Sequence, residues 1–521
     1  MENVMSLLRA IVLVGAFVLT AGAQAVTVKV DSGSVLGEAA DGMHVFRGIP
    51  FAAPPVGDLR WRPPQAVAPW SGTRDATQFS AACPQPPTFA AMGMQLPELS
   101  EDCLYLNVWT KDTQAKMPVM VWIHGGGLTL GWGHQEGYEG TNLATQGVVL
   151  VSVNYRLGPL GFLAHPGLTK ESERGVSGNY GLLDQVAALE WVQSNIAAFG
   201  GDPDNVTIFG ESAGGTSVNA LVASPLAEGL FHGAIAQSPW ITDSNFADLK
   251  KPQARVQSAE QLGQDWAERM LEGASPEDAI AQLRGMDGLA LQEKTGNNYP
   301  VHVTVDGWVM PDTSSDIFLR GEHNDVPMIV GTNTDEGTMF LGALPFNTPD
   351  AFRASIRSVY GDRADALIGL YPVASEADLF AAKNQFITDA WFVRGAKAML
   401  VGSDKASSPA FEYHFSRRSK AMPQWGAHHA LEIGYAFDNL NPAMSDEVDQ
   451  RLASAMTRYW VQFAKTGNPN LSGLPVWPEY SAETDPHLEL GDEIRTGTGH
   501  RRAAIATWNG AIADEVDGGS D

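Results

Sequence analysis

A serine between two glycines lies near the middle of the chain, in the motif FGESAGG at residues 209–215. A serine on a sharp turn between a strand and a helix exposes its hydroxyl and can act as a nucleophile. Ser212 follows an apolar run and precedes a segment compatible with a helix, Thr216 to Val222, whose first N–H groups would face the reacting centre. The glycines at 210 and 214 allow neighbouring backbone to approach closely. Ordinary turns also contain this motif, but the flanking strand and helix favour a nucleophile.

Three consecutive glycines upstream of this serine could supply hydrogen-bond donors. The sequence HGGG at 124–127 follows an apolar run that ends at Ile123. Glycines free the backbone to turn successive N–H groups into one cavity, as the tetrahedral oxyanion of an acyl-transfer reaction requires. We expect the N–H groups of Gly126, Gly127 and Ala213 to form this oxyanion hole. The alternative is a flexible surface loop.

Alternating strands and helices are predicted to position these groups. Near-continuous apolar runs separated by helical patterns are typical of a mostly parallel sheet that is covered by helices on both faces. The patterns predict strands at 119–123, 148–153, 206–209 and 326–330, and a helix at 182–198. Helix-rich segments at 244–295 and 349–403 are expected above or beside the sheet, with an amphipathic helix at 446–465.

The composition is that of a compact globular protein and argues against nucleic acid as a partner. Of 521 residues, 44% are hydrophobic and 18% are charged, which excludes disorder, collagen-like repeats and coiled coils. Lys and Arg total 34 against 60 Asp and Glu, so the formal net charge is −26. A chain this acidic repels phosphate backbones and anionic membrane surfaces.

The first 25 residues have the pattern of an export signal. Arg9 precedes an apolar run at 10–21, and Ala23-Gln24-Ala25 is a small–x–small cleavage signature. The run is too short to span a bilayer. We expect a signal peptide at 1–25, a mature chain from near Val26, a secreted or periplasmic location and no stable membrane association. The alternative is an uncleaved N-terminal membrane anchor.

The two cysteines, Cys83 and Cys103, are expected to form a disulfide. An exported protein meets an oxidising compartment, where a pair of cysteines favours one bond that closes a loop. Two free buried thiols are the alternative. The cysteines have no metal-like spacing, and we expect neither a metal nor an organic cofactor.

Five further motifs complete a pattern that resembles the type-B carboxylesterase family, which includes the cholinesterases. They are FRGIPFA at 46–52, EDCLYLNV at 101–108, NYRLG at 154–158, GNYGLLDQ at 178–185 and AFGGDP at 198–203. The resemblance covers nearly the whole mature chain and implies the α/β-hydrolase fold. The expected architecture is a large central, mostly parallel sheet flanked by helices, with helical insertions around an active-site gorge, in a single catalytic domain at 26–521.

The resemblance also implies two partners for Ser212. In this fold the order along the chain is serine, acid, histidine. The family's acid is the glutamate of a Gly-x-x-x-Asp-Glu-Gly stretch, here GTNTDEG, which implies Glu336 rather than Asp335. The residues alone do not separate these adjacent carboxylates. The family's Gly-x-x-His-x-x-Glu pattern matches GAHHALE and implies His429 rather than its neighbour His428.

These residues predict a serine hydrolase that cleaves small-molecule carboxylic esters. His429 would remove the proton of Ser212, and Glu336 would orient the imidazole and stabilise its charged form. Attack of the serine on the ester carbonyl would give an acyl-enzyme, which water hydrolyses. One alternative is a non-catalytic, cholinesterase-like binding protein, which would lack members of this triad. Another is an amidase, carbamate hydrolase or lactonase with the same triad.

Residues near these motifs are candidates for the substrate pocket. They are Glu211, Leu128, Trp132, Tyr299 and His302. In cholinesterases, the loop closed by the first disulfide carries a tryptophan that stacks on the choline cation. Here residues 84–102 contain Phe89 as their only aromatic, so a choline site is not expected.

Overall fold

One large sheet organises the fold. The structure is a computed structural model that describes residues 24–242, 244–253, 256–271 and 278–517. In chain order its strands are β1 (Gln24–Val30), β2 (Gly33–Ala40), β3 (Met43–Pro50), β4 (Thr73–Asp75), β5 (Tyr105–Thr110), β6 (Met117–Ile123), β7 (Val149–Val153), β8 (Gly201–Glu211), β9 (Gly233–Gln237), β12 (Met328–Asn333), β13 (Ala410–Phe415), β14 (Pro486–Leu490) and β15 (Ile494–Thr498). Two short strands, β10 (Phe246–Asp248) and β11 (Val303–Val305), form a separate pair.

The middle of this sheet is parallel, as the sequence predicts. Its 13 strands have the order β1-β2-β3-β5-β7-β6-β8-β9-β12-β13-β14-β15, with β4 beside β2. The pairings from β7 to β14 are parallel. The successive pairings of β1, β2, β3, β5 and β7 are antiparallel, as is that of β14 with β15. The carboxyl ends of the parallel strands therefore meet along one edge, where catalytic loops gather in such folds.

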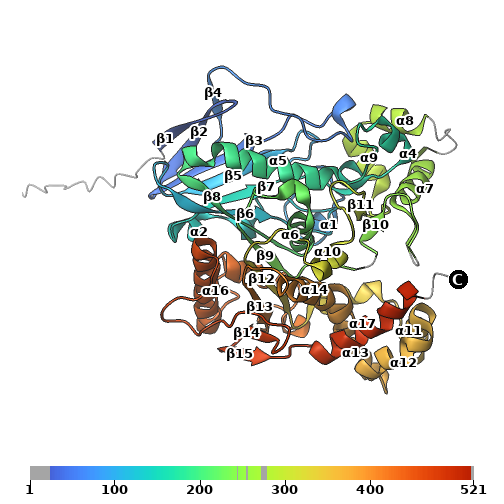
Figure 1. The fold of residues 1–521 in the computed structure, drawn as a ribbon. Coiled ribbons are helices and arrows are strands. Elements are labelled where there is room, and N and C mark those ends of the chain that lie inside the picture. Colours follow the sequence, from blue (N-terminus) through green and yellow to red (C-terminus); the bar gives the residue numbers. More distant parts are fainter. Residues whose placement is uncertain (1–23, 243, 254–255, 272–277, 518–521) are drawn as a thin grey trace, which may run out of the picture.

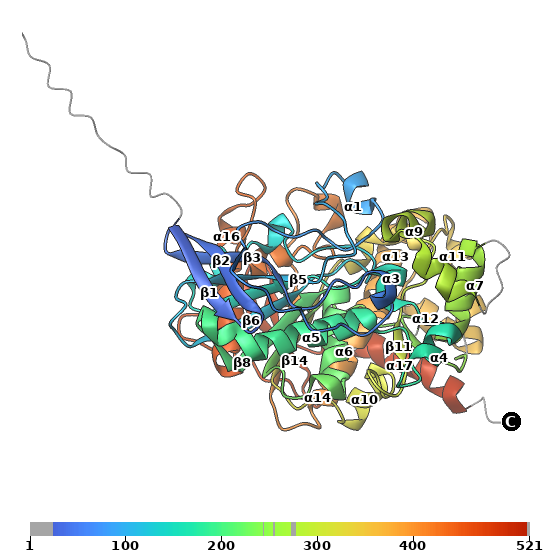
Figure 2. The ribbon, with the colours of Figure 1, turned by 90° about the horizontal axis from the view of Figure 1, so that it is seen from above.

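The helices lie on both faces of the sheet and at one end of it. They are α1 (Thr88–Ala91), α2 (Thr141–Thr145), α3 (Gly158–Phe162), α4 (Pro166–Glu171), α5 (Tyr180–Asn195), α6 (Ala213–Ala223), α7 (Ala259–Leu271), α8 (Ala279–Gly285), α9 (Gly288–Thr295), α10 (Ser314–Arg320), α11 (Pro349–Tyr360), α12 (Ala364–Leu370), α13 (Leu379–Ile387), α14 (Arg394–Ser403), α15 (Ile433–Ala436), α16 (Glu447–Thr466) and α17 (Arg502–Asp517). A π-helix, Thr388–Val393, joins α13 to α14. The N-terminal strands and helices α7, α11 and α12 lie at opposite ends of the molecule (Figure 2).

Alternate residues of the central strands enter two different cores. In β6, Val119 and Val121 pack in the core that includes α5 and α6, whereas Met120 and Trp122 pack in the core that includes α16. Helices α5 and α16 accordingly lie on opposite sides of β6 and β8 (Figure 1). Strand residues that are apolar on both faces produce the continuous hydrophobic runs in the sequence.

All four predicted strands are present with shifted ends: β6 begins at Met117 rather than at residue 119, and β7 begins at Val149 rather than at residue 148. Strand β8 extends the predicted 206–209 in both directions, so that it ends at Glu211, immediately before Ser212. Strand β12 begins at Met328 rather than at residue 326. The residue before it, Pro327, has no N–H to donate to a neighbouring strand.

The predicted signal peptide lies outside the described residues except for its last two positions. Gln24 and Ala25 form the start of β1 and pair with Ala39 and Glu38 of β2. Over the part of the chain that the structure describes, each helix is too short or too polar to cross a bilayer.

Candidate active site

Ser212 occupies a strained turn between β8 and α6. Its backbone has φ 59° and ψ −121°, a left-handed conformation that costs a non-glycine residue about 1–3 kcal/mol. A side-chain carbon at Gly214 would lie 2.1 Å from the carbonyl oxygen of Ile123, and one at Gly210 would lie 2.6 Å from that same oxygen. Both glycines are therefore needed for β8, β6 and α6 to meet at this turn. The N–H of Ser212 donates to the Gln237 carbonyl at 2.9 Å, which fixes the turn to β9.

Glu336 and His429 form a buried pair close to this turn. His429 Nδ1 lies 2.6 Å from Glu336 Oε2. Glu336 Oε1 accepts hydrogen bonds from Ser238 Oγ at 2.6 Å and from the Asn333 N–H at 2.7 Å. These three bonds fix the carboxylate, so that Nδ1 carries the imidazole proton and Nε2 is the nitrogen that can act as a base.

The other ring nitrogen of His429 faces the end of β8. Nε2 lies 3.2 Å from Oε1 of Glu211, the residue immediately before Ser212. The rings of Phe340 and Phe392 hold the imidazole from its sides, with centroid distances of 5.1 and 4.7 Å. The structure therefore brings together the serine turn, the histidine and the glutamate that the family pattern implies.

The two neighbouring candidates, Asp335 and His428, point elsewhere. Asp335 Oδ2 accepts from the Ala427 N–H, and its Oδ1 accepts from Asn384 Nδ2, both at 2.9 Å. His428 Nδ1 lies 2.8 Å from the His429 carbonyl, and its ring packs edge-on against Trp425. Asp335 thus connects the loop that carries Glu336 to the loop that carries His429, while Glu336 itself meets the imidazole.

The glycine loop after β6 lies directly against the serine. A side-chain carbon at Gly125 would lie 3.1 Å from Ser212 Cβ and 2.7 Å from the Glu211 carbonyl oxygen. Gly126 and Gly127 have φ of 106° and 63°. Among the described residues, the N–H groups of Gly126, Gly127 and Ala213 donate no hydrogen bond within the protein. Ala213 directly follows Ser212, and the two glycines directly follow Gly125, which packs against it.

Three buried glutamates surround His429 and set its charge. Glu432 Oε2 accepts from Asn333 Nδ2 at 2.6 Å, and Glu211 and Glu336 approach the two ring nitrogens. Burial lowers the pKa of His429, but the carboxylates of Glu211 and Glu336 outweigh it and raise this pKa to about 9. Burial raises the pKa of Glu211 well above its ordinary range. Both groups therefore bind a proton more tightly than they would in water.

Glu211→Gln is expected to move the acid limb of the pH profile of kcat/KM to lower pH. A base must be neutral to accept a proton, so activity rises as the pH passes upward through its pKa. Removing the Glu211 charge removes one cause of the raised pKa of His429. The measurement is kcat/KM from pH 5 to 10, with Glu190→Gln, an exposed change on α5, as the charge-matched control. An acid limb that stays at the wild-type pH in Glu211→Gln would contradict the account.

The remaining pocket candidates divide into two groups. Leu128, with φ 58°, follows the glycine loop, and its carbonyl accepts from the Gly158 N–H at 2.8 Å. Trp132 packs edge-on against Phe89 of the disulfide loop. The described contacts of Tyr299 and His302 are those of core residues, away from Ser212 and His429. The Tyr299 hydroxyl donates to the Phe162 carbonyl, its ring packs on Trp266, and His302 Nδ1 lies 2.8 Å from the Pro300 carbonyl.

Three residues of the site escaped the sequence analysis. Phe340 lies only four positions after Glu336, and this closeness in the sequence is a signal that could have identified it as a neighbour of the site. Phe392 and Ser238 come from the π-helix and from the end of β9, and only the tertiary fold brings them to His429 and Glu336.

The predicted disulfide between Cys83 and Cys103 is confirmed. Within the described ranges, no group of His, Cys, Asp and Glu side chains is arranged to hold a metal ion.

Comparison with known proteins identifies the family. A family model described as the carboxylesterase family matches residues 24–508. The chain is 39% identical over 487 residues to a fumonisin B1 esterase of Sphingopyxis macrogoltabida, covering 90% of this chain and 87% of the relative. It is 39% identical over 485 residues to a para-nitrobenzyl esterase of Bacillus subtilis (strain 168), covering 89% and 94%. A solved structure of a PNB esterase superposes with a TM-score of 0.79 at 33% identity, covering 92% of this chain and 99% of the other. This chain is a carboxylic ester hydrolase and belongs to the carboxylesterase family.

Proposed function

We propose that Ser212, His429 and Glu336 are the catalytic triad through which this chain hydrolyses carboxylic esters. One observation carries the assignment. The 2.6 Å contact between Glu336 and His429 Nδ1 leaves Nε2 turned towards the end of β8, where Ser212 directly precedes α6. A histidine held in this tautomer can take a proton from the serine and return it to the leaving group.

The chemistry follows from this arrangement. Ser212 Oγ attacks the ester carbonyl carbon while His429 Nε2 accepts the hydroxyl proton. Glu336 stabilises the imidazolium that forms. The N–H groups of Gly126, Gly127 and Ala213 hold the oxyanion of the tetrahedral intermediate, and each such donor is worth roughly 100-fold or more in kcat. The alcohol leaves with the proton from His429, and water then attacks the acyl-serine by the same route.

The covalent intermediate makes this proposal testable. Rapid mixing with a p-nitrophenyl ester should give a burst of p-nitrophenolate equal in amount to the enzyme, if acylation is faster than deacylation. Quenching during the burst and measuring the intact mass should show one acyl group per chain. A linear onset with no acylated chain, across acetate and butyrate esters, would count against an acyl-enzyme that accumulates.

Comparing carbonyl classes separates the ester assignment from the alternatives that share the triad. Matched ester, amide, carbamate and lactone substrates should be compared by kcat/KM. An ester has a better leaving group than the matched amide, and the oxyanion hole serves both equally. We therefore propose the ester as the preferred substrate. The relatives carry the names fumonisin B1 esterase, para-nitrobenzyl esterase and cocaine esterase.

The surroundings of His429 favour an uncharged ester with an apolar group. Phe340 and Phe392 contact the imidazole, and Trp391 and Trp240 continue this aromatic wall. The one aromatic ring of the disulfide loop, Phe89, packs edge-on against Trp132. An apolar acyl or alcohol group buries surface against such rings at a gain of about 25 cal/mol per Å².

A choline ester is expected to have no advantage over its uncharged isostere, in which tert-butyl replaces trimethylammonium. A cation–π contact with a desolvated ring is worth about 2 kcal/mol, or more than tenfold in specificity. No tryptophan lies between Cys83 and Cys103 to provide it. The measurement is kcat/KM for this pair at moderate salt, which suppresses steering by the acidic surface. A tenfold preference for the cation would show that another ring, such as Trp132 or Trp391, supplies the contact.

We also propose that the chain is exported. The charged, apolar and small-residue pattern of residues 9–25 supports this proposal, and so does the Cys83–Cys103 disulfide, which persists in oxidising compartments. N-terminal sequencing of protein recovered outside the cytoplasm, expected to start near Val26, checks it.

A further inference from the structure

The segment that carries the proposed oxyanion donors has little regular structure of its own. Residues 124–133, called here the oxyanion loop, follow β6 and contain neither helix nor strand. The Gly126 carbonyl accepts from the N–H groups of Thr129 and Leu130 at 3.1 and 2.9 Å, and Gly131 has φ of 109°. An oxyanion hole works only if its donors are held in place before the reaction. The loop therefore needs support from other parts of the chain.

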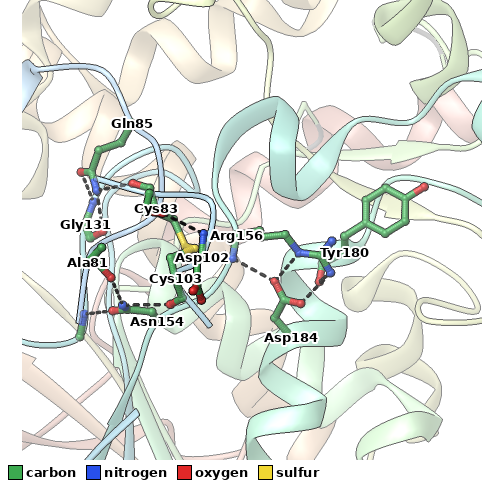
Figure 3. The surroundings of a disulfide bond; sticks show 12 residues. Ala81, Cys83, Gln85, Asp102, Cys103, Gly131, Asn154, Arg156, Tyr180 and Asp184 are labelled. Carbon is green, nitrogen blue, oxygen red and sulfur yellow. Dashed lines mark hydrogen bonds and ion pairs between the residues drawn. A yellow bond between two sulfur atoms is a disulfide. The ribbon is translucent and has the colours of Figure 1, made fainter. Parts of the chain in front are cut away.

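Gln85 supplies such support from the disulfide loop. Its Oε1 accepts from the Gly131 N–H at 2.8 Å, and its Nε2 donates to the Gly131 carbonyl at 3.0 Å. Nε2 also donates to the carbonyl of Cys83 at 3.1 Å. Gln85 is 4% exposed, so water does not replace these bonds. Figure 3 shows the side-chain amide beside Gly131, with the Cys83–Cys103 bond next to it.

The side-chain amide of Asn154 connects the segments that carry Cys83 and Cys103 to the same loop. Asn154 Oδ1 accepts from the Gly133 N–H at 2.8 Å. Its Nδ2 donates to the carbonyls of Ala81 and Cys103, both at 3.2 Å. The C-terminal half of the oxyanion loop is thus bound to both cysteine-bearing segments, which the disulfide holds together (Figure 3).

The position of Gly131 determines where the catalytic half of the loop can lie. A side-chain carbon at Gly131 would lie 2.4 Å from His124 Nδ1 and 2.7 Å from the Gly125 carbonyl oxygen, so the two halves of the loop are in close contact. Gly125 in turn packs against Ser212 Cβ. A displacement of Gly131 would therefore displace Gly125, and with it the distance from the N–H groups of Gly126 and Gly127 to Ser212.

We propose that Gln85 is a positioning residue of the oxyanion hole, and that the Cys83–Cys103 disulfide fixes the position of Gln85. The proposal rests on the proposed function, because it assumes that the N–H groups of Gly126 and Gly127 stabilise the oxyanion formed by attack of Ser212. Gln85 touches no reacting atom, and it acts through Gly131. Its loss should weaken stabilisation of the transition state and leave binding of the ground-state ester nearly unchanged.

Two variants of Gln85 test this proposal. Gln85→Glu has nearly the same shape and keeps the acceptor for the Gly131 N–H, but it places a second acceptor against the Gly131 carbonyl. Gln85→Leu removes both bonds to Gly131 and the bond to the Cys83 carbonyl. The matched control is Gln193→Leu, because the Gln193 amide, which is half-buried, also donates to two backbone carbonyls, those of Pro203 and Leu230, away from the site.

The measurements are kcat, KM and the affinity for a trifluoromethyl ketone, which adds the serine and presents an oxyanion to the hole. Active sites are counted by titration. Both Gln85 variants should lose about tenfold to a hundredfold in kcat per site and a similar factor in ketone affinity, with KM within about threefold of wild type. Gln193→Leu should keep wild-type values of all three.

The possible results separate this proposal from the function on which it rests. If Gln85→Glu and Gln85→Leu lose thermal stability but keep wild-type kcat and ketone affinity per titrated site, Gln85 is only structural and the proposal is wrong. The same holds if KM rises while kcat stays unchanged. If the wild-type enzyme itself forms no adduct at Ser212, the proposed function fails and the role of Gln85 fails with it.

Discussion

Replacing Ser212 with alanine is expected to lower kcat for ester hydrolysis by roughly 10⁵-fold to 10⁶-fold. Alanine has no hydroxyl to attack the carbonyl, so the acyl-enzyme route is closed. Residual hydrolysis would come from binding and the oxyanion hole, which together retain about 10³-fold over water in a serine enzyme. Expression and thermal unfolding should stay close to wild type. The backbone bonds of Ser212, from its N–H to Gln237 and from the Thr216 N–H to its carbonyl, do not use the hydroxyl.

Ser217→Ala on the same helix is the matched control for this change. Ser217 is buried and accepts a hydrogen bond from Gln185 Nε2 at 3.0 Å. Its loss leaves a buried donor unpaired, which costs about 1–3 kcal/mol of stability. Kcat per folded molecule should be unchanged. If Ser217→Ala lost activity as deeply as Ser212→Ala, the loss would reflect damage to α6 and not loss of the nucleophile.

Replacing His429 with alanine should lower kcat about as far as Ser212→Ala, because the two residues act as a unit. His429 is the imidazole that meets Glu336 at 2.6 Å, and it lies close to the start of α6. The adjacent His428 provides a matched control, since it is also buried but bonds to backbone and packs on Trp425. His428→Ala should change kcat by less than about tenfold.

Steady-state kinetics at pH 8 with stability controls decide between the two histidines. A His428→Ala variant that is inactive and folded, beside an active His429→Ala variant, would require the two assignments to be exchanged. Comparable losses in both would show that the 428–429 backbone, and not one imidazole, is the sensitive feature.

The sequence is sufficient to predict the features of the site that depend on local chain geometry. Ser212 needs a strand, a sharp turn and a helix in immediate succession, and all three leave local patterns. Gly210 and Gly214 are recognisable because any side chain there would collide with β6 or with the turn itself. The parallel sheet is likewise visible in apolar runs such as that of β6, whose residues alternate between two cores.

Residues that meet only through the tertiary fold could not be predicted in this way. Adjacent carboxylates such as Asp335 and Glu336 have the same chemistry, and only the packing of the loops shows which one meets His429. Gln85 and Gly131 are 46 positions apart, so no local pattern marks their bonds. Tyr299 and His302 illustrate the converse difficulty, because aromatic residues near a site motif in the sequence can equally be core residues.

The most direct test of the central claim is the site of covalent labelling by a fluorophosphonate. The reagent phosphonylates a serine that a neighbouring base activates, and the oxyanion hole receives its phosphoryl oxygen. Peptide mapping by mass spectrometry should place one label per chain on Ser212, with hydrolysis lost in proportion to labelling. Ser212→Ala should take up no label, and His429→Ala should be labelled far more slowly. A stoichiometric label on any other serine, or full labelling with activity retained, would contradict the account.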